Sequence, residues 1–384
     1  MKVEYGSFKH KLLIAIMLAG EYPYKSLDLM REGYGTKLPV LKDLKDSGYI
    51  SILEACGAKR IRFKMFEKKK KDYASQLFVG GEKYVPDIRS NGKRKLDRKD
   101  RIAEIVIMML EAGINVTPDV KPSPADKGPL SEGNDCLPYF ITSLEARAAI
   151  TIKEDKGKGA RFHGALISAG GVYNVYNMGD SMMEWVRPSE MTAMDFNIQY
   201  QAKMTPWGKN LGLEWMGNSA IVLSRNMQYI EPFVKGTLKA THGRGSSKNL
   251  ANINEYYDRT FFLPLNREGQ ILINIMTKKK WHHYLVGLFF GKNELADLQT
   301  KQSIACDALK DGCYYLVFLD CDIGRLRRFV DIEIAPEDAG KYKIICYDFQ
   351  ESAVRNLAPP GMDVITYKFD EVVNAFYAVY NEQQ

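Results

Sequence analysis

The stretch from residue 24 to residue 66 constrains the fold most strongly, because its hydrophobic periodicity changes in the middle. In its first half, Leu38, Leu41 and Leu44 recur at helical spacing and predict a helix with one face towards a core. In its second half the period becomes two, which is typical of β-strands. The sequence therefore predicts a helix that is followed at once by a β-hairpin.

A short helix is expected to precede this one. It would span residues 25–31 and be broken by Gly33 and Gly35. Thr36 can then cap the second helix through its hydroxyl oxygen, and Pro39 falls in the first turn, where a missing N–H is tolerated. Four polar residues of the second helix are expected to point outwards towards phosphates: Thr36, Lys37, Lys42 and Lys45.

The hairpin is predicted to consist of a strand over 50–55, a turn over 56–58 and a return strand over 59–66. Along the return strand apolar residues alternate with cations, so one face is expected to be buried and the other cationic. The cations of that face are Arg60, Arg62 and Lys64. This order of parts is that of a winged helix-turn-helix, whose second helix enters the major groove. The alternative is a small α/β lobe with a merely solvated basic face.

The charge distribution favours a nucleic-acid partner. The chain of 384 residues has a formal charge of +7, but residues 1–101 alone contain 24 Lys and Arg against 13 Asp and Glu. The basic character is therefore local, as expected for a nucleic-acid face rather than for a generally basic protein. Basic runs at 68–71 and 93–95 would extend the phosphate-binding track of the hairpin.

Helices on either side complete a predicted winged-helix domain over 1–113. The apolar run 12–18 is too short to span a membrane and is predicted to belong to the first helix, which ends at Gly20. Residues 102–110 carry a helical apolar stripe that ends at Gly113. A helix of this kind closes a winged-helix domain or pairs two copies, so a homodimer is an open alternative.

A segment rich in proline, 114–138, is predicted to link two domains. Beyond it, 139–384 alternates strand and helix patterns and is predicted to form one larger α/β sheet domain, which makes the fold class mixed α/β. The strand candidates are 161–168, 172–177, 221–224, 261–265, 314–319, 343–349 and 362–369. Helical patterns cover 270–290, 294–309 and 351–357.

Six dispersed cysteines without a C-x-x-C pair argue against a zinc site and a disulfide framework. They indicate free thiols in a reducing compartment. No stretch is long and apolar enough to cross a bilayer. We therefore expect a soluble cytoplasmic protein with no membrane partner and no cofactor.

Two places in the second half could carry chemistry. The Gly- and Ser-rich basic loop 241–249 could hold a phosphate, but its spacing differs from a P-loop, and a surface loop is the favoured interpretation. Asp320 and Asp322 follow an apolar strand and could share one Mg²⁺ or Mn²⁺ ion. In the favoured alternative these aspartates form ion pairs with three arginines: Arg325, Arg327 and Arg328.

Two weaker patterns also bear on catalysis. The pairs Asp119-x-Lys121 and Glu154-x-Lys156 contain the residue types of a metal-dependent nuclease, but they lie in Pro-rich and Gly-rich surroundings. The two adjacent histidines at 282–283 cannot easily bind one ion together, so a surface pair or a hydrogen-bonded pair is expected.

The order of parts resembles the replication-relaxation family of plasmids and integrative elements, and so do two stretches: ARFHGALISAGGVYNVYN at 160–177 and YYLVFLDCDIGRLRRF at 314–329. The resemblance implies an N-terminal winged helix, an α/β domain and action on the DNA of a mobile element. The Arg-Pro-Asp and acidic strand motifs of that family are not clearly present, so no catalytic residue is implied. Relaxase chemistry would need a His-hydrophobic-His metal site, which 282–283 does not provide.

These patterns predict a sequence-specific protein that binds double-stranded DNA, acting at an origin or as a regulator of a mobile element. The α/β domain is expected to bind a partner or to serve assembly. The alternative class is a metal-dependent nuclease or phosphotransfer enzyme that uses Asp320 and Asp322, with Mg²⁺ or Mn²⁺ as cofactor. Non-enzymatic DNA binding is the favoured prediction.

Overall fold

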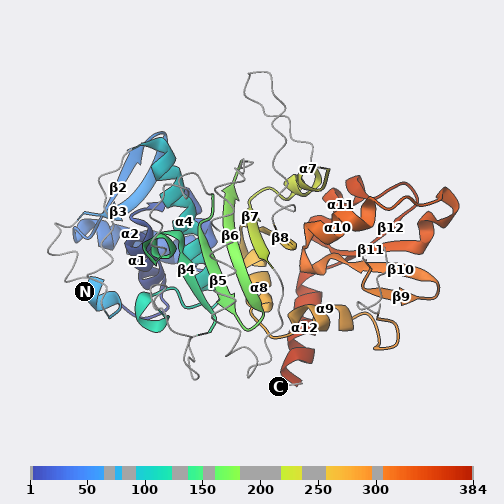
Figure 1. Ribbon diagram of the computed structural model, residues 1–384. Helices are drawn as coiled ribbons and strands as arrows, with labels where there is room; N and C mark the ends of the chain where they lie inside the picture. Colours follow the sequence, from blue (N-terminus) through green and yellow to red (C-terminus); the bar gives the residue numbers. More distant parts are fainter. Residues whose placement is uncertain are drawn as a thin grey trace.

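The computed structural model shows a mixed α/β protein with sheets of three, five and four strands, which follow one another from left to right in Figure 1. Among the helices of the described residues, none combines the length and the apolar character needed to cross a membrane. The structure describes residues 3–64, 74–79, 92–122, 137–149, 161–181, 218–235, 257–295 and 306–382.

The N-terminal unit, which we define as α1 to α4, contains the three-stranded sheet. Its elements are α1 (Phe8–Ala19), β1 (Tyr22–Pro23), the 3-10 helix η1 (Tyr24–Leu29), α2 (Tyr34–Asp46), β2 (Ile50–Ala55), β3 (Ala58–Phe63) and α4 (Lys93–Glu111). Strand β3 lies between β1 and β2 and is antiparallel to both. The predicted hairpin is confirmed, and its turn residues Cys56 and Gly57 have φ of 53° and 76°, the positive values that a two-residue hairpin turn requires.

Helix α2 begins earlier than predicted, with Gly33 at its N-cap. Thr36 therefore lies in the first turn instead of capping the helix, and Pro39 lies inside it. Leu41 and Leu44 are buried as predicted, but Leu38 is 49% exposed. Leucines three residues apart are displaced by about 60° around the helix axis at each step, so Leu38 lies at the edge of the buried face.

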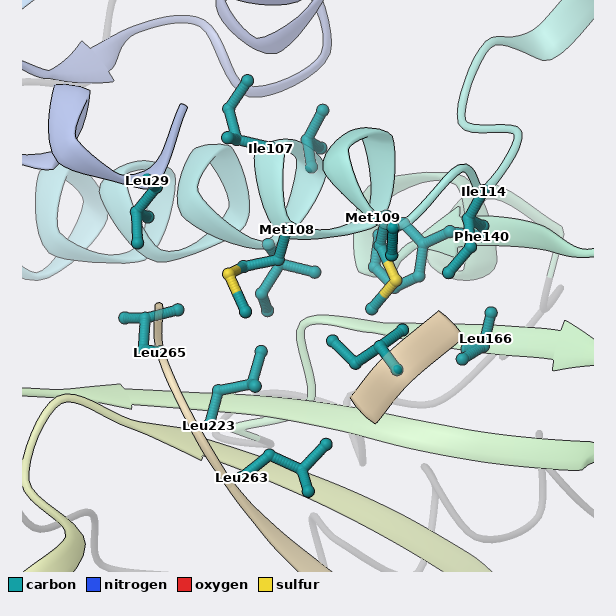
Figure 2. Packing of buried hydrophobic residues seen from close by; sticks show 14 of the residues in the cluster. Leu29, Ile107, Met108, Met109, Ile114, Phe140, Leu166, Leu223, Leu263 and Leu265 are labelled. Carbon is teal, nitrogen blue, oxygen red and sulfur yellow. The ribbon is translucent and has the colours of Figure 1, made fainter. Parts of the chain in front are cut away.

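Helix α4 lies between the rest of the N-terminal unit and the central sheet. Every residue from Ile102 to Met109 is buried, so this part of the helix is enclosed on all sides rather than along one stripe. Figure 2 shows Met108 and Met109 pointing towards the side of the sheet, where Leu223 lies, whereas Ile107 points away from the sheet. One cluster of buried residues therefore joins the N-terminal unit to the sheet.

The central sheet has its strands in sequential order: β4 (Tyr139–Thr142), β5 (Gly164–Ser168), β6 (Gly171–Gly179), β7 (Ser219–Ser224) and β8 (Arg259–Pro264). The first three strands are antiparallel neighbours, and the last three are parallel. The predicted hairpin of β5 and β6 is thus confirmed. Alternation along β7 sends Ile221 and Leu223 to the face packed on α4, and Ala220 and Val222 to the opposite face.

The third sheet has the order β12-β11-β10-β9, in which only β9 is antiparallel to its neighbour. Its strands are β9 (Ala308–Lys310), β10 (Cys313–Val317), β11 (Tyr342–Tyr347) and β12 (Asp363–Tyr367). The helices of the second half are α5 (Ser143–Ala149), α7 (Ile230–Lys235), α8 (Arg267–Met276), α9 (Trp281–Gly287), α10 (Ile323–Val330), α11 (Glu351–Leu357) and α12 (Phe369–Glu382). Short 3-10 helices are η3 (Pro118–Val120), η5 (Met227–Tyr229), η7 (Phe318–Asp320), η8 (Pro336–Lys341) and η9 (Asp348–Gln350).

Three predictions for this half are wrong in detail. The expected single sheet is divided into two, because among the described residues β8 pairs with the segment after β10 through one isolated bridge, between Phe261 and Asp322. The helix predicted over 270–290 consists of α8 and α9, separated at Lys280, whose φ is 56°. A helix was predicted over 294–309, but the last residues of this range belong to strand β9. Residues 296–305 lie outside the described part of the chain.

The ends of the predicted linker are packed into the fold. Ile114 and Val116 are buried, and Asn115 exchanges backbone hydrogen bonds with Pro138 and Phe140. Residues 123–136 lie outside the described part of the chain. The predicted division into a domain over 1–113 and a domain over 139–384 stays a prediction.

Candidate functional site

The predicted DNA-binding residues lie on α2 and on the adjacent hairpin of β2 and β3. Thr36, Lys42 and Lys45 are exposed on α2, Lys64 is exposed just after β3, and Arg62 is half-buried. Helix α2 packs against β2, so these side chains belong to neighbouring elements of the same unit. Their surface position agrees with the sequence prediction, and their contact with DNA stays a prediction.

Lys37 has a structural role instead of the expected outward position. Its side chain is only 3% exposed, and its ammonium group donates hydrogen bonds of 2.7 Å to the carbonyl oxygens of Leu27 and Met30. These carbonyls lie at the end of η1, where helix termini leave acceptors without partners. Lys37 therefore holds η1 against α2, and its expected outward orientation is wrong.

Arg60 is also buried, at 3% exposure, although the alternation of β3 predicted an outward side chain. Helix α4 covers this part of the strand. Asp100 of α4 accepts bonds of 3.0 Å from Nε and 2.7 Å from Nη2 of Arg60, and Asp97 lies 3.8 Å away. The hydrogen bond to Asp100 raises the pKa of Arg60 despite the burial. Arg60 thus fixes the hairpin to α4.

The first turns of α4 add further cations beside the hairpin. Lys93, Arg94 and Lys95 are exposed there. The contact between Arg60 and Asp97 brings this end of α4 next to β3. The basic run at 93–95, which the sequence assigned to the same track as the hairpin, therefore lies close to it. The run at 68–71 falls outside the described residues.

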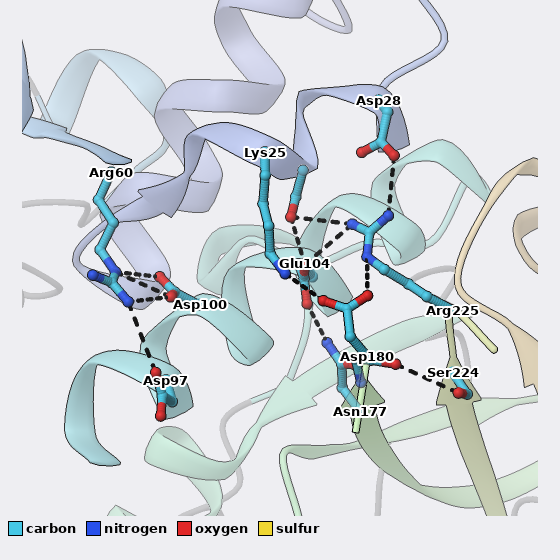
Figure 3. A network of polar contacts seen from close by, with 12 residues as sticks. Lys25, Asp28, Arg60, Asp97, Asp100, Glu104, Asn177, Asp180, Ser224 and Arg225 are labelled. Carbon is cyan, nitrogen blue, oxygen red and sulfur yellow. Dashed lines mark hydrogen bonds and ion pairs between the residues drawn. The ribbon is translucent and has the colours of Figure 1, made fainter. Parts of the chain in front are cut away.

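A polar network joins η1 and α4 to the carboxyl ends of the parallel strands (Figure 3). Glu104 of α4 is buried and accepts hydrogen bonds from Asn177 at 2.8 Å, from Arg225 at 3.3 Å and from Ser26. Arg225 follows β7 and also donates to Asp28 of η1 at 3.0 Å. The network therefore includes both the N-terminal unit and the sheet.

This network occupies the edge of the sheet at which α/β proteins usually bind ligands. Asp180 directly follows β6 and pairs with Lys25 of η1 at 2.5 Å. A pocket of about 220 Å³ lies beside these residues and is lined by Asp97, Asp100 and Glu104 among others. These carboxylates already pair with Arg60 and Arg225, so contacts of the N-terminal unit occupy this edge of the sheet.

Asp320 and Asp322 lie at a sharp turn between β10 and α10. Cys321 has a left-handed φ of 62°, which directs the two carboxylates to different partners. Asp322 caps α10 by accepting from the backbone N–H groups of Gly324 at 3.0 Å and Arg325 at 3.3 Å. The same turn bonds to β8 through its backbone and so connects the second and third sheets.

Arg325 lies between two buried carboxylates, Asp307 and Asp320. It donates to Asp320 at 2.6 Å and to Asp307, and it lies 2.8 Å from the Nε2 atom of His282. Burial opposes ionisation of Asp320, but the charge of Arg325 outweighs it and, with His282, keeps the pKa of Asp320 below its usual range. Burial and the nearby Asp320 carboxylate raise the pKa of Asp322.

This arrangement corrects the predicted set of ion pairs. Arg325 alone of the three arginines pairs with Asp320, while Arg327 pairs with Asp331 at 3.4 Å and Arg328 is exposed. Within the described residues, no group of three or more acidic, His or Cys side chains has the arrangement of a metal site. A divalent ion at Asp320 would have to displace the guanidinium group of Arg325.

The remaining candidates lie elsewhere or outside the described residues. Asp119 accepts a hydrogen bond from the backbone of Val79, and Lys121 is buried and paired with Glu145 at 2.9 Å. The loop 241–249 and the pair at 154–156 are not among the described residues. The sequence patterns do not indicate the Glu104 network, because its members are polar residues in four separate segments of the chain.

No family model matches the sequence, and comparisons with curated proteins and with solved structures find no similar protein. The described residues define the class as a mixed α/β protein, with three sheets among them.

We predict that Glu104→Ala lowers the free energy of unfolding of the full chain by about 2 to 3 kcal/mol, since Asn177, Arg225 and Ser26 each lose a charged acceptor inside a largely buried network. Urea unfolding followed by fluorescence measures the change. The matched control is Glu351→Ala, which removes an exposed pair with Arg355 and should cost less than about 1 kcal/mol. Equal costs for the two variants would contradict the structural role of the network.

We predict that Asp320→Asn destabilises the chain by about 3 kcal/mol, because the buried charge of Arg325 loses one of its two carboxylate partners. The expected cost is larger than that of Asp331→Asn, whose pair with Arg327 is exposed. Thermal unfolding should be unchanged by a chelator or by Mn²⁺. A rise in the unfolding temperature with Mn²⁺ that is absent in Asp320→Asn would instead support the metal-dependent enzyme.

Proposed function

We propose that this chain is a sequence-specific protein that binds double-stranded DNA through a winged helix formed by the N-terminal unit. The observation that carries the proposal is the arrangement of α2 beside the hairpin of β2 and β3, with exposed cations on both elements. The sheet order β1-β3-β2 and the position of η1 before α2 support it, since a winged helix has the same order of parts.

In this proposal α2 enters the major groove, and Lys42 and Lys45 contact phosphates on its flanks. Lys64 and Arg62 of the hairpin contact the sugar-phosphate backbone or the minor groove. The exposed cations at 93–95 extend the same surface along α4. Lys37 and Arg60 are buried beneath this surface and fix the positions of the elements that form it, so they contribute to binding indirectly.

In this proposal, contacts with the second half of the chain fix the orientation of the N-terminal unit. Helix α4 and the Glu104 network attach the unit to the central sheet, so the orientation of α2 is set by the whole protein. The third sheet lies far from α2 in Figure 1 and is free to bind a partner or a second copy. Action at an origin or in the control of a mobile element fits this layout.

The test is the binding of the full chain to a labelled duplex, followed by fluorescence anisotropy at several salt concentrations. Replacing Lys42 and Lys45 by alanine should weaken binding. It should also reduce the slope of log affinity against log salt by about 0.9 for each phosphate that the variant no longer neutralises. Replacing Arg62 and Lys64 should have a similar effect.

The control replaces two exposed cations of the second half, Lys292 and Arg328, by alanine. This variant has the same change in net charge, so its slope should stay close to that of the unsubstituted chain. If the control and the α2 variant show the same decrease in slope, binding is a general charge effect and the proposed surface is wrong.

A further inference from the structure

The exposed face of α2 is unusual in its first two turns. Tyr34 is 58% exposed and Leu38 is 49% exposed, and Thr36 and Pro39 are exposed between or beside them. These are among the larger apolar exposures of the described residues, and they lie together on one helix. The cations Lys42 and Lys45 follow in the later turns. The helix therefore offers an apolar surface first and a cationic surface afterwards.

Recognition of bases in the major groove depends on side-chain chemistry. Arg and Lys recognise guanine through its O6 and N7 acceptors, and Asn and Gln recognise adenine through N6 and N7. Apolar side chains and the methyl group of Thr contact the 5-methyl group of thymine. The N-terminal residues of a recognition helix are those that reach the base edges.

Helix α2 lacks the side chains that recognise purines through bidentate hydrogen bonds at the positions that reach the bases. The segment Tyr34–Asp46 contains no Arg, Asn or Gln. Its first lysine, Lys37, is buried and bonded to the carbonyls of Leu27 and Met30, so it is not available to guanine. The exposed face of the first two turns therefore leaves mainly methyl and ring groups for contact with bases.

On the basis of the proposed function, we infer that α2 reads A·T base pairs through the methyl groups of thymine. Leu38 is the main contact, with Tyr34 beside it one turn earlier in the helix. Lys42 and Lys45 bind the flanking phosphates and supply the charge complementarity that brings this apolar surface to DNA. Specificity thus comes from shape and methyl contacts rather than from bidentate hydrogen bonds.

The experiment selects bound sites from a randomised duplex pool with the full chain, and then compares the selected duplex with one in which dT is replaced by dU. The replacement removes only the methyl groups. We expect A·T pairs at the centre of the selected site and about a fourfold decrease in affinity for each buried methyl group removed, from the transfer free energy of one such group.

Two variants assign this effect to α2. Leu38→Ala, which changes an exposed residue, should bind the dT duplex more weakly and should distinguish it less from the dU duplex. Lys42→Ala should weaken binding to both duplexes by the same factor. The ratio of its affinities for the dT and dU duplexes should therefore equal that of the unsubstituted chain. The inference would be overturned if Leu38→Ala had the same ratio of affinities for the dT and dU duplexes as the unsubstituted chain.

The outcomes separate this inference from the proposed function. A selected site with G·C pairs at its centre, or equal affinity for the dT and dU duplexes, would overturn methyl readout while duplex binding stands. If the full chain binds no duplex at all, the proposed function fails and the inference fails with it.

Discussion

The burial of α4 on all sides is the constraint on which the rest of the structure depends. From Ile102 to Met109 the helix has no exposed face, so it must be enclosed by other elements before it can be stable. The other elements of the N-terminal unit cover one side, and the central sheet with α8 covers the other. Neither part can leave without exposing a large apolar area, which costs about 25 cal/mol for each Å². The orientation of α2 is therefore coupled to the whole molecule.

Polar contacts make this attachment specific. Apolar packing alone would allow α4 to slide or rotate, but Glu104 needs three partners from η1, β6 and the end of β7 at once. A buried carboxylate without such partners is strongly destabilising, so one arrangement is selected. The pair of Arg60 and Asp100 fixes the position of the β2–β3 hairpin against α4 in the same way. As a result the carboxyl edge of the parallel strands, where ligands bind in many α/β proteins, here holds the proposed DNA-binding unit.

The sequence predicted elements whose periodicity is local. The hairpins β2–β3 and β5–β6 and the helix α11 follow directly from alternation, turns and spacing. It could not predict which polar side chains are buried, because burial depends on distant elements: Lys37 points inward to reach carbonyls of η1, and Arg60 is covered by α4. The pair of Asp320 with Arg325 was predicted, because the two residues lie close together in the sequence. The other partners of Arg325, Asp307 and His282, come from separate segments and have no local signal.

The most direct test of DNA binding by the N-terminal unit is hydrogen–deuterium exchange of the full chain with and without a duplex that it binds. We predict slower exchange in α2 and in the β2–β3 hairpin when DNA is bound, because DNA covers these segments. We predict no change in residues 306–382, which lie to the right of the central sheet in Figure 1, away from α2. Protection confined to residues 306–382, with α2 unchanged, would contradict the claim that the N-terminal unit reads DNA.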